Sequence, residues 1–549
     1  MKEDEFCYDT LGELVDSCVT FYKEHKDELS ADHVRKNRSE LAGFAELFHS
    51  QCGTLHPSVQ KRIEDLRGGM GLVVMTAHQP NLFPYDGVMR KATLAFVLAK
   101  KLEQKLGVPV VSVFGIADQD FGADRWVKTM MLPDAERRDG ILELRLSVPE
   151  KLMLNRVQKP SENTLSLWKK EIIAWMNREI LLARQADPLV QLCKEKEERV
   201  KSNFDAFWLM VEDAYWKANV LSDFNAFVIS KIVNEVWGYD TLFVRFSECQ
   251  RSFLKEFSFL LSNFREYSRA IKQVSSSESR LRGGVSEKEW EFAPFWYHCD
   301  CGSKVRLGVF WRGEHCFASG NCLLCGKDYE FDFGSCGDVK ISGIMPRVSA
   351  RSISMPLVVL SGLGVSCYIG GQGGKDYLLQ AKQVAESMGV CFPPVVVWRP
   401  KDNYLGLGQL GALVTFEKIV GSFDQSEINS IKTSLEQKIA QVYSDLSDLE
   451  NEKNNLLQNA SNAPNAEIIG RLKELSAKQA EIRRREKYSE LVRDVKLIGN
   501  AIDALNLHPS IVDYAVSVGL KETSAQWIDS LEDQDSWSKG CKLKTVFDS

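Results

Sequence analysis

The sequence predicts an α/β protein whose parallel sheet is assembled from two separate parts of the chain. A strand–helix–strand unit occupies Leu72–Phe121, and a second α/β segment runs from Ile341 to Val397. The length of 549 residues also suggests two or three structural units rather than one small domain. Helical segments and a small cysteine-containing insert separate the two parts, so we expect one sheet split by insertions.

The first α/β unit begins with an apolar strand and ends with an acidic cluster. Leu72–Met75 is apolar without alternation, as expected of a strand that is covered on both faces. After a polar turn at residues 76–81, a helix is expected between Asp86, its N-cap, and Gly107, its C-terminal stop. Residues 108–116 form the second strand. Ligands bind at the carboxyl ends of parallel strands, so the polar residues after both strands are candidate ligand contacts.

The remainder of the chain divides into regions of different pattern. Residues 141–148 and 241–246 read as strands, residues 165–237 as helices, residues 252–271 as one further helix, and residues 275–284 as a polar connector. We expect six segments: an N-terminal helical segment (1–70), the first part of the core with a helical insertion (71–294), a four-cysteine insert (295–335), the second part of the core (336–420), a helical hairpin (421–500) and a C-terminal helical segment (501–549).

The predicted hairpin carries a heptad pattern. Apolar residues recur every seven positions from Ile428 to Leu456, residues 460–465 interrupt the pattern, and a second run begins at Ile468. The pattern predicts an antiparallel coiled-coil hairpin, with two ordinary bundle helices as the alternative. Either structure provides a scaffold or a partner surface rather than catalytic groups.

Composition and charge restrict the class of protein. The hydrophobic fraction of 44% and charged fraction of 26% are ordinary for a globular protein, and the net charge of −6 argues against a general nucleic-acid binder. The amino terminus is acidic and lacks an apolar signal core, while Pro356 and Gly362 interrupt the longest apolar region, so no membrane span is expected. We expect a cytoplasmic protein whose 14 cysteines are free thiols or metal ligands.

Two cysteine pairs form the most specific motif in the sequence. One residue separates Cys299 from Cys301, and two residues separate Cys322 from Cys325; a glycine directly follows the second cysteine of each pair. Two such pairs can close a tetrahedral four-sulfur site, and the glycines permit the tight turns of a zinc knuckle. Because protein ligands fill all four positions, the predicted zinc is structural; iron and unligated thiols are the alternatives. The residues close enough in sequence to replace one ligand are His298, His315, Cys316 and Cys336.

A glycine-rich turn at residues 370–374 lies between a predicted strand and a predicted helix. The backbone N–H groups of Gly371 and Gly373 could hold a phosphate or carboxylate, and Lys375 could add positive charge. The turn is not a Walker loop, because Ile369 stands where the first glycine is required and Asp376 replaces the Ser or Thr that would bind magnesium. The alternative is a tight strand–helix turn without a ligand.

Polar side chains at the two strand ends are the other candidates. An imidazole at His78 could contact a phosphate or act as an acid or base, although a lone histidine is more often structural. The carboxylates of Asp118 and Asp120 could bind ribose hydroxyls, an amine or Mg²⁺, or they could cap the next helix. Arg347 could meet an anionic substrate or form a surface ion pair. The candidates for catalysis are His78, Asp118 and Asp120, and those for substrate or nucleotide binding are Gln79, Asn81, Gln119, Arg347, Gly371, Gly373 and Lys375.

Short patches along most of the chain resemble the BshC family, the proposed cysteine-adding enzymes of bacillithiol synthesis. Residues 73–83 resemble a family segment that typically contains Thr-Gly-Gln-Gln-Pro-Gly-Leu, and residues 117–121 resemble its Glu-Asp-His-Asp-Phe segment. The chain differs by having His78, Ala77 and Gln119 where the family has Gln, Gly and His, and by its four-cysteine insert. The other similar patches are Lys91-Ala92, residues 106–111, 368–373 and 393–397 with Arg399, the heptad hairpin and residues 507–511.

The resemblance implies a Rossmann-like nucleotide-binding core with connecting insertions and a coiled-coil arm. It further implies a ligase that joins cysteine to an amino-sugar malate conjugate. We therefore expect a BshC-like ligase that binds a nucleotide or sugar-like substrate, with ATP or ADP and Mg²⁺ as candidate cofactors beside structural Zn²⁺. The alternatives are a nucleotidyl-transfer enzyme and a catalytically inactive assembly protein. The hairpin would mediate homo-oligomerisation or bind another partner protein.

Overall fold

The computed structural model describes most of the chain. The described residues are 5–69, 71–185, 193–277, 288–335, 338–398, 402–421, 427–460 and 466–548. Most of the predicted connector at 275–284, residues 461–465 of the predicted helix break, Cys336 and Arg399 lie outside these residues.

A parallel sheet of five strands forms the centre of the molecule. Its order is β12-β11-β1-β2-β5, so strands from before and after the insertions lie side by side. This arrangement confirms the α/β class and the expected split sheet. The chain leaves β1 toward β2 on one side and returns to β11 on the other, which makes the β1–β11 boundary the topological switch point. The strands are β1 (Leu72–His78), β2 (Val110–Ile116), β5 (Leu242–Arg245), β11 (Val365–Gly370) and β12 (Val395–Val397).

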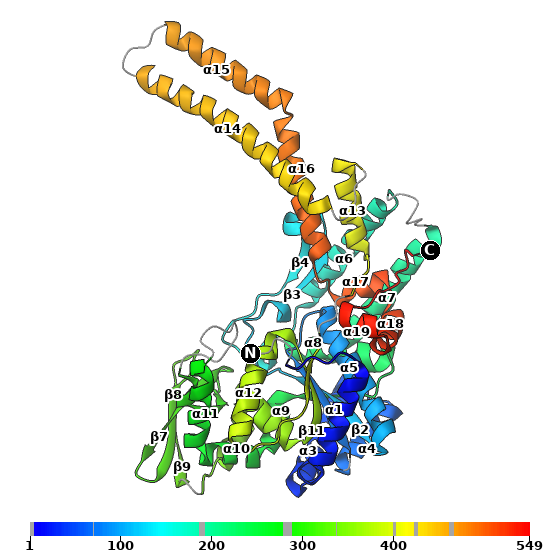
Figure 1. Ribbon diagram of the computed structural model, residues 1–549, viewed down its shortest axis with the longest axis vertical. Coiled ribbons are helices and arrows are strands. Elements are labelled where there is room, and N and C mark those ends of the chain that lie inside the picture. Colours follow the sequence, from blue (N-terminus) through cyan, green and yellow to red (C-terminus); the bar gives the residue numbers. More distant parts are fainter. Residues whose placement is uncertain are drawn as a thin grey trace.

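Both faces of the parallel sheet are buried, which explains the uninterrupted apolar runs. Along β1, Leu72 and Val74 pack toward the first and fifth helices, whereas Val73 and Met75 pack into the core on the opposite face. Figure 1 shows helices lying over the sheet on either side. The helices of the body are α1 (Leu11–Glu24), α2 (Lys26–Leu29), α3 (Asp32–Cys52), α4 (Pro57–Arg67), α5 (Asp86–Leu106), α6 (Glu162–Ala183), α7 (Lys194–Lys217), α8 (Leu221–Ser230), α9 (Phe246–Cys249), α10 (Leu254–Ser262), α11 (Phe264–Ser277), α12 (Lys375–Ser387), α13 (Leu407–Val420), α17 (Ile511–Ser517), α18 (Leu520–Glu532) and α19 (Gln534–Lys539).

The four-cysteine insert forms an antiparallel sheet beside the parallel one. The order of this second sheet, which we call the ribbon sheet, is β10-β6-β7-β8-β9. It occupies the lower left of the body in Figure 1, next to α11. A separate two-stranded hairpin pairs β3 with β4. The strands are β3 (Thr129–Pro133), β4 (Ile141–Arg145), β6 (Phe292–His298), β7 (Lys304–Arg312), β8 (His315–Asn321), β9 (Asp328–Ser335) and β10 (Val348–Ala350).

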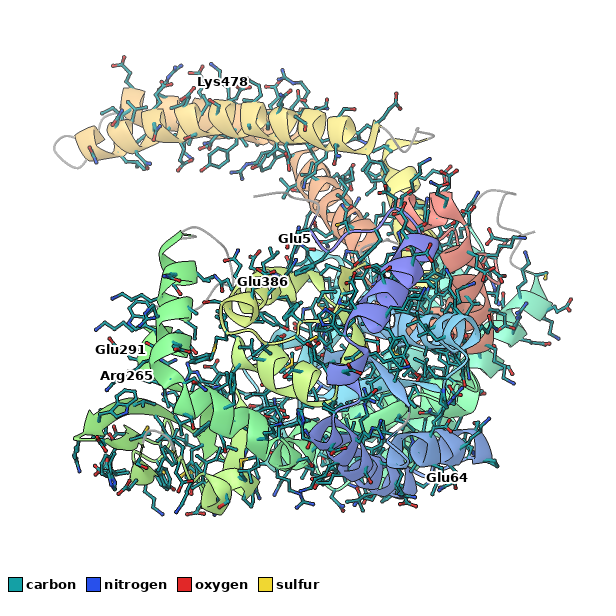
Figure 2. The ribbon with its side chains drawn as sticks, turned by 60° about the horizontal axis from the view of Figure 1, so that its bottom comes forward. Glu5, Glu64, Arg265, Glu291, Glu386 and Lys478 are labelled. Atoms are coloured by element: carbon teal, nitrogen blue, oxygen red, sulfur yellow. The ribbon has the colours of Figure 1, made fainter. Side chains whose placement is uncertain are left out.

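Two long helices, α14 (Ile428–Ala460) and α15 (Ala466–Arg485), form an arm that projects from the body, and α16 (Tyr488–Asn506) leads back to it. Gln479 of α15 bonds to Glu450 of α14, whereas the earlier Arg471 bonds to the later Glu452, so the two helices are antiparallel. Figure 2 shows side chains, including Lys478, extending from the arm clear of the body. The predicted antiparallel helical hairpin is thereby confirmed.

Several predicted boundaries were wrong. β1 continues through residues 76–78, where a polar turn was expected, because β2 pairs with it as far as His78, whereas the pairing with β11 ends at Thr76. Asp86 is not the N-cap of α5: Tyr85 takes that position, and Asp86 instead forms a 2.6 Å ion pair with Arg90. Gly107 ends α5 in the left-handed conformation, as predicted. The single helix expected over residues 252–271 is broken at Asn263 into α10 and α11.

None of the helices in the described part of the chain is long and apolar enough to cross a membrane. The region around Pro356 and Gly362, the longest apolar stretch, contains instead a short buried helical segment followed by β11.

Candidate functional site

The candidate site lies at the carboxyl edge of the parallel sheet, where β1 and β11 diverge. His78 ends β1, Gly370 ends β11, and the turn that begins with residue 117 follows β2. The helices that follow these strands cover opposite faces: α5 packs with Leu72 and Val74, and α12 packs with Val73 and Met75. In open α/β sheets, this divergence is where ligands bind, so the turn after β1 and the turn after β11 are the places to look for ligand contacts.

Lys91 of α5 connects the ends of β1 and β11. Its ammonium donates to the carbonyl of Ala77 at 3.1 Å and would lie 3.7 Å from a Cβ placed on Gly371. The side chain is only 6% exposed, and burial lowers the pKa of Lys91 to about 7. A buried ammonium with one carbonyl partner would gain greatly from an anionic ligand. Sequence reasoning missed Lys91 as a site residue, although a lysine on the buried side of an apolar helix was the available signal.

His78 is a neutral imidazole at the end of β1. Burial, reinforced by the positive charge of Lys91, lowers the pKa of His78 to about 3. Its Nδ1 lies 2.9 Å from the carbonyl oxygen of Gln79, and a carbonyl can only accept, so Nδ1 carries the proton. The Nε2 atom is then an acceptor. His78 can accept a hydrogen bond from a ligand, but it is a poor general acid at neutral pH.

Asp120 joins the ends of β1 and β2 to the ribbon sheet. Its carboxylate accepts from Gln79 Nε2 at 3.0 Å and lies 3.6 Å from the ammonium of Lys304 on β7. Its charge also helps to raise the pKa of Tyr377 of α12 to about 12, although burial of the tyrosine is the larger cause. The structure thus brings Gln79 and Asp120 together as predicted, and it adds Lys304, which no local pattern indicated.

Asp118 is placed differently from Asp120. Its side chain is fully buried, and both carboxylate oxygens accept from Ser247, one from the backbone N–H at 2.9 Å and one from the hydroxyl. Burial raises the pKa of Asp118 to about 6, and the two bonds from Ser247 partly offset this effect. Asp118 thus caps α9, because Ser247 lies in the first turn of that helix; the expected alternative, a cap on the next helix along the chain, is not what Asp118 forms.

Three buried amides near the strand ends have polar atoms without a hydrogen-bond partner among the described residues. They are Nδ2 and Oδ1 of Asn81, which lies beside His78, Oε1 of Gln119 and Oδ1 of Asn155. Asn81 and Gln119 are 1% and 6% exposed, so their unpaired atoms are costly unless water or a ligand satisfies them. These atoms are suited to a polar ligand that offers both donors and acceptors.

The glycine-rich turn provides backbone at the end of β11. Close packing explains two of its glycines: a Cβ at Gly370 would lie 2.8 Å from Leu378, and one at Gly374 would lie 2.9 Å from Tyr377. Around Gly373 there is open space, and Lys375 is half-buried at the first position of α12. Gly371 therefore adjoins the site through Lys91, whereas Gly373 borders an open surface.

Arg347 lies away from these strand-end contacts. It ends a short 3₁₀ helix at residues 342–347, where it donates to the Tyr297 hydroxyl at 3.0 Å and pairs with Asp300. Its partners belong to the ribbon sheet and the first cysteine knuckle, and none of the other predicted site residues is among them.

The four predicted cysteines converge at one end of the ribbon sheet. Their sulfur atoms all lie within 4.8 Å of one another, with 3.6 Å between Cys299 and Cys325 and 3.4 Å between Cys301 and Cys322. Zinc–sulfur bonds of about 2.3 Å in a tetrahedron require sulfur separations of about 3.8 Å, so the quartet fits a metal ion. The predicted glycine turns are confirmed, with φ of +87° at residue 302 and +73° at residue 326.

The surroundings of the quartet also suit a thiolate centre. The Tyr329 hydroxyl lies 3.2 Å from the Cys299 sulfur, and the backbone N–H of Leu324 donates to the Cys322 sulfur. The two histidines proposed as substitute ligands are engaged elsewhere: His298 bonds to Ser349, and His315 contacts Asp332. Within the described residues, this cluster consists of the four cysteines alone.

Comparison with known proteins identifies the region that contains most of the site. The family model for bacillithiol biosynthesis BshC, N-terminal Rossmann-like domain, matches residues 16–221. No curated protein matches the chain. The matched region includes β1, α5 and β2, and therefore His78, Lys91 and Asp120. Over residues 16–221, the chain is therefore similar to the N-terminal Rossmann-like domain of the BshC family.

Proposed function

We propose that the chain is a BshC-like ligase of thiol biosynthesis. It would bind a nucleotide or sugar-like substrate at the carboxyl edge of the sheet and join cysteine, or another amine, to an acidic small molecule. The observation that carries the proposal is the family match over residues 16–221, because it covers the strand ends at which the buried polar groups converge.

The described contacts suggest a role for each part of the site. Lys91, with the backbone at Gly371, would bind a phosphate or carboxylate, since the ammonium is buried and points at both turns. The unpaired amide atoms of Asn81 and Gln119 would form hydrogen bonds with hydroxyl or amide groups of the ligand. The neutral Nε2 of His78 would accept a hydrogen bond from the reacting amine.

A nucleotide cofactor is consistent with these groups. A bound nucleoside triphosphate would supply the activation of the carboxylate that amide formation requires. Both carboxylates have protein partners, but Asp118 is fully buried against Ser247, whereas the side chain of Asp120 is 36% exposed; Asp120 would therefore be the carboxylate to bind Mg²⁺, in exchange for its contacts with Gln79 and Lys304. Lys91 would offset phosphate charge at the same edge of the sheet.

Binding and metabolite measurements test this function. Calorimetry with Mg²⁺ and ATP or ADP should detect binding by the unmodified protein, and binding should be lost in Lys91→Met. Lys105→Met is the matched control, because Lys105 lies on the same helix but is exposed and paired with Asp16. In cells lacking the chain, metabolite profiling should show a missing thiol and an accumulated acidic precursor. Normal thiol levels, together with no nucleotide binding, would rule out the proposed function.

We further propose that the cysteine quartet holds structural Zn²⁺, with iron as the alternative. Its four thiolates fill a tetrahedral coordination shell and leave no position for substrate. The thiolates must remain reduced to bind metal, which supports the proposal that the protein works in the cytoplasm. Elemental analysis of purified protein would distinguish the two metals.

The arm is the surface that we propose for self-association or for another partner. It projects from the body, and its apolar residues Tyr443, Leu457 and Ile469 are 63%, 51% and 51% exposed. Exposed apolar side chains on a projecting helical pair favour docking of further helices. Light scattering of the full chain should report an oligomer that Leu457→Glu with Ile469→Glu reduces to a monomer. Unchanged mass would assign the arm no role in self-association.

A further inference from the structure

The first cysteine knuckle is hydrogen-bonded to the segment that supports the candidate site. The carbonyl of Gly302, next to Cys301, accepts from the backbone N–H of Met153 at 2.9 Å. A Cβ at Gly302 would lie 2.9 Å from Leu152 and 3.0 Å from Arg156, so the knuckle and this segment are packed closely. The knuckle is therefore in direct contact with the body of the protein.

The same segment is bonded to the turn after β2. Met153 forms an antiparallel bridge with Phe121, and the next residue, Leu154, donates its backbone N–H to the carbonyl of Asp120 at 2.9 Å. The backbone N–H of Asn155 donates to the carbonyl of Asp118 at the same distance. Residues 152–155 thus lie between the cysteine knuckle and the two acidic residues at the end of β2.

Lys304 makes a second connection between the knuckles and the site. Its backbone carbonyl accepts from the N–H of Leu323 in the second knuckle at 3.1 Å. Its side chain is 4% exposed, lies over the rings of Phe121 and Trp296 at 5.0 and 5.7 Å, and reaches Asp120. A lysine held in this way contributes a fixed positive charge next to the strand ends.

We propose that the four-cysteine metal centre positions the candidate site as well as folding the ribbon sheet. Metal bound by the quartet fixes both knuckles, and the knuckles hold Lys304 against Asp120 and residues 152–155 against the turn after β2. Lys304 is thus a positioning residue for Asp120. The inference deepens the proposed function, because it assigns the metal-held ribbon to the same site.

Hydrogen exchange measured by mass spectrometry tests this inference without any substrate. The full chain is compared in its metal-loaded form, after chelation, and as Cys325→Ser, which removes an exposed ligand and leaves no core cavity. Metal loss should accelerate exchange at least tenfold in peptides covering residues 118–122 and 152–156, while α5 peptides stay unchanged. Re-addition of Zn²⁺ to the chelated protein should restore protection.

Amine labelling of lysines provides a second measurement. Lys304 should be protected in the metal-loaded protein and become at least tenfold more reactive after chelation. Lys105, exposed on α5 and outside the ribbon sheet, is the internal control and should react equally in both forms. If accelerated exchange is confined to residues 299–335 and Lys304 stays protected without metal, the inference is overturned. Failure of nucleotide binding by metal-loaded protein would count against the proposed function and leave these two readouts unaffected.

Discussion

Replacing Lys91 by methionine should stabilise the protein while it destroys ligand binding. Methionine keeps the length and packing of the side chain but removes a charge that is buried at the end of β1. In the folded chain the pKa of Lys91 is about 7, compared with 10.5 for a free lysine. The unfolded chain therefore binds more protons than the folded chain between these two pH values, and stability rises with pH across this window.

The magnitude follows from the two pKa values. At pH 7 the shift destabilises the folded protein by about 4 kcal/mol, and at pH 9.5 by about 1 kcal/mol. Loss of the hydrogen bond to Ala77 should cost the variant about 1 kcal/mol at either pH. We therefore expect Lys91→Met to be more stable than the unmodified protein by about 3 kcal/mol at pH 7 and nearly equal to it at pH 9.5.

Urea unfolding at the two pH values measures this difference. Hydrogen exchange of the β1 and α5 peptides should follow the transition, so that the result reports the unit containing Lys91 rather than the arm or the ribbon. Lys105→Met, on the exposed side of α5, should show no such pH-dependent difference. A variant that is less stable than the unmodified protein at both pH values would refute the reasoning, because the buried ammonium would then be a net source of stability.

Three further predictions concern the metal, acid stability and the arm. Chelation, or Cys325→Ser, should remove about one zinc ion per chain and unfold the ribbon sheet, as seen by proteolysis; intact β6–β9 fragments would contradict this. Burial lowers the pKa of His78 to about 3, so this residue alone should cost about 1.4 kcal/mol of stability per pH unit below pH 6.5, and His78→Gln should be less acid-sensitive than the unmodified protein; urea midpoints of the two proteins that change in parallel between pH 7 and 5 would contradict this. Leu475→Ala, at a fully buried arm position, should cost about 2–5 kcal/mol and lower the melting temperature of the arm by circular dichroism, whereas the exposed Ile469→Ala should not.

The local features of the parallel core could be predicted because they depend on short-range patterns. The apolar run at Leu72, the stop at Gly107 and the strand–turn–helix at residues 365–387 each follow from a few neighbouring residues. The continuation of β1 to His78 could not be predicted from its local polar pattern, because it depends on pairing with β2, whose Ile116 lies opposite His78. The partner of Asp118 could not be predicted either, because Ser247 is 129 residues away in the sequence.

The sequence by itself determined the α/β class, the heptad hairpin and the convergence of two cysteine pairs, since periodicity and ligand spacing are local properties. It also placed polar side chains at the strand ends. Only the tertiary structure decided which of them meet. Lys91 is buried against the ends of both β1 and β11, and Lys304 reaches Asp120 from a sheet that begins more than 170 residues later. Such contacts depend on how the sheets and helices pack, because the energy of a buried charge is set by neighbours that come from anywhere in the chain.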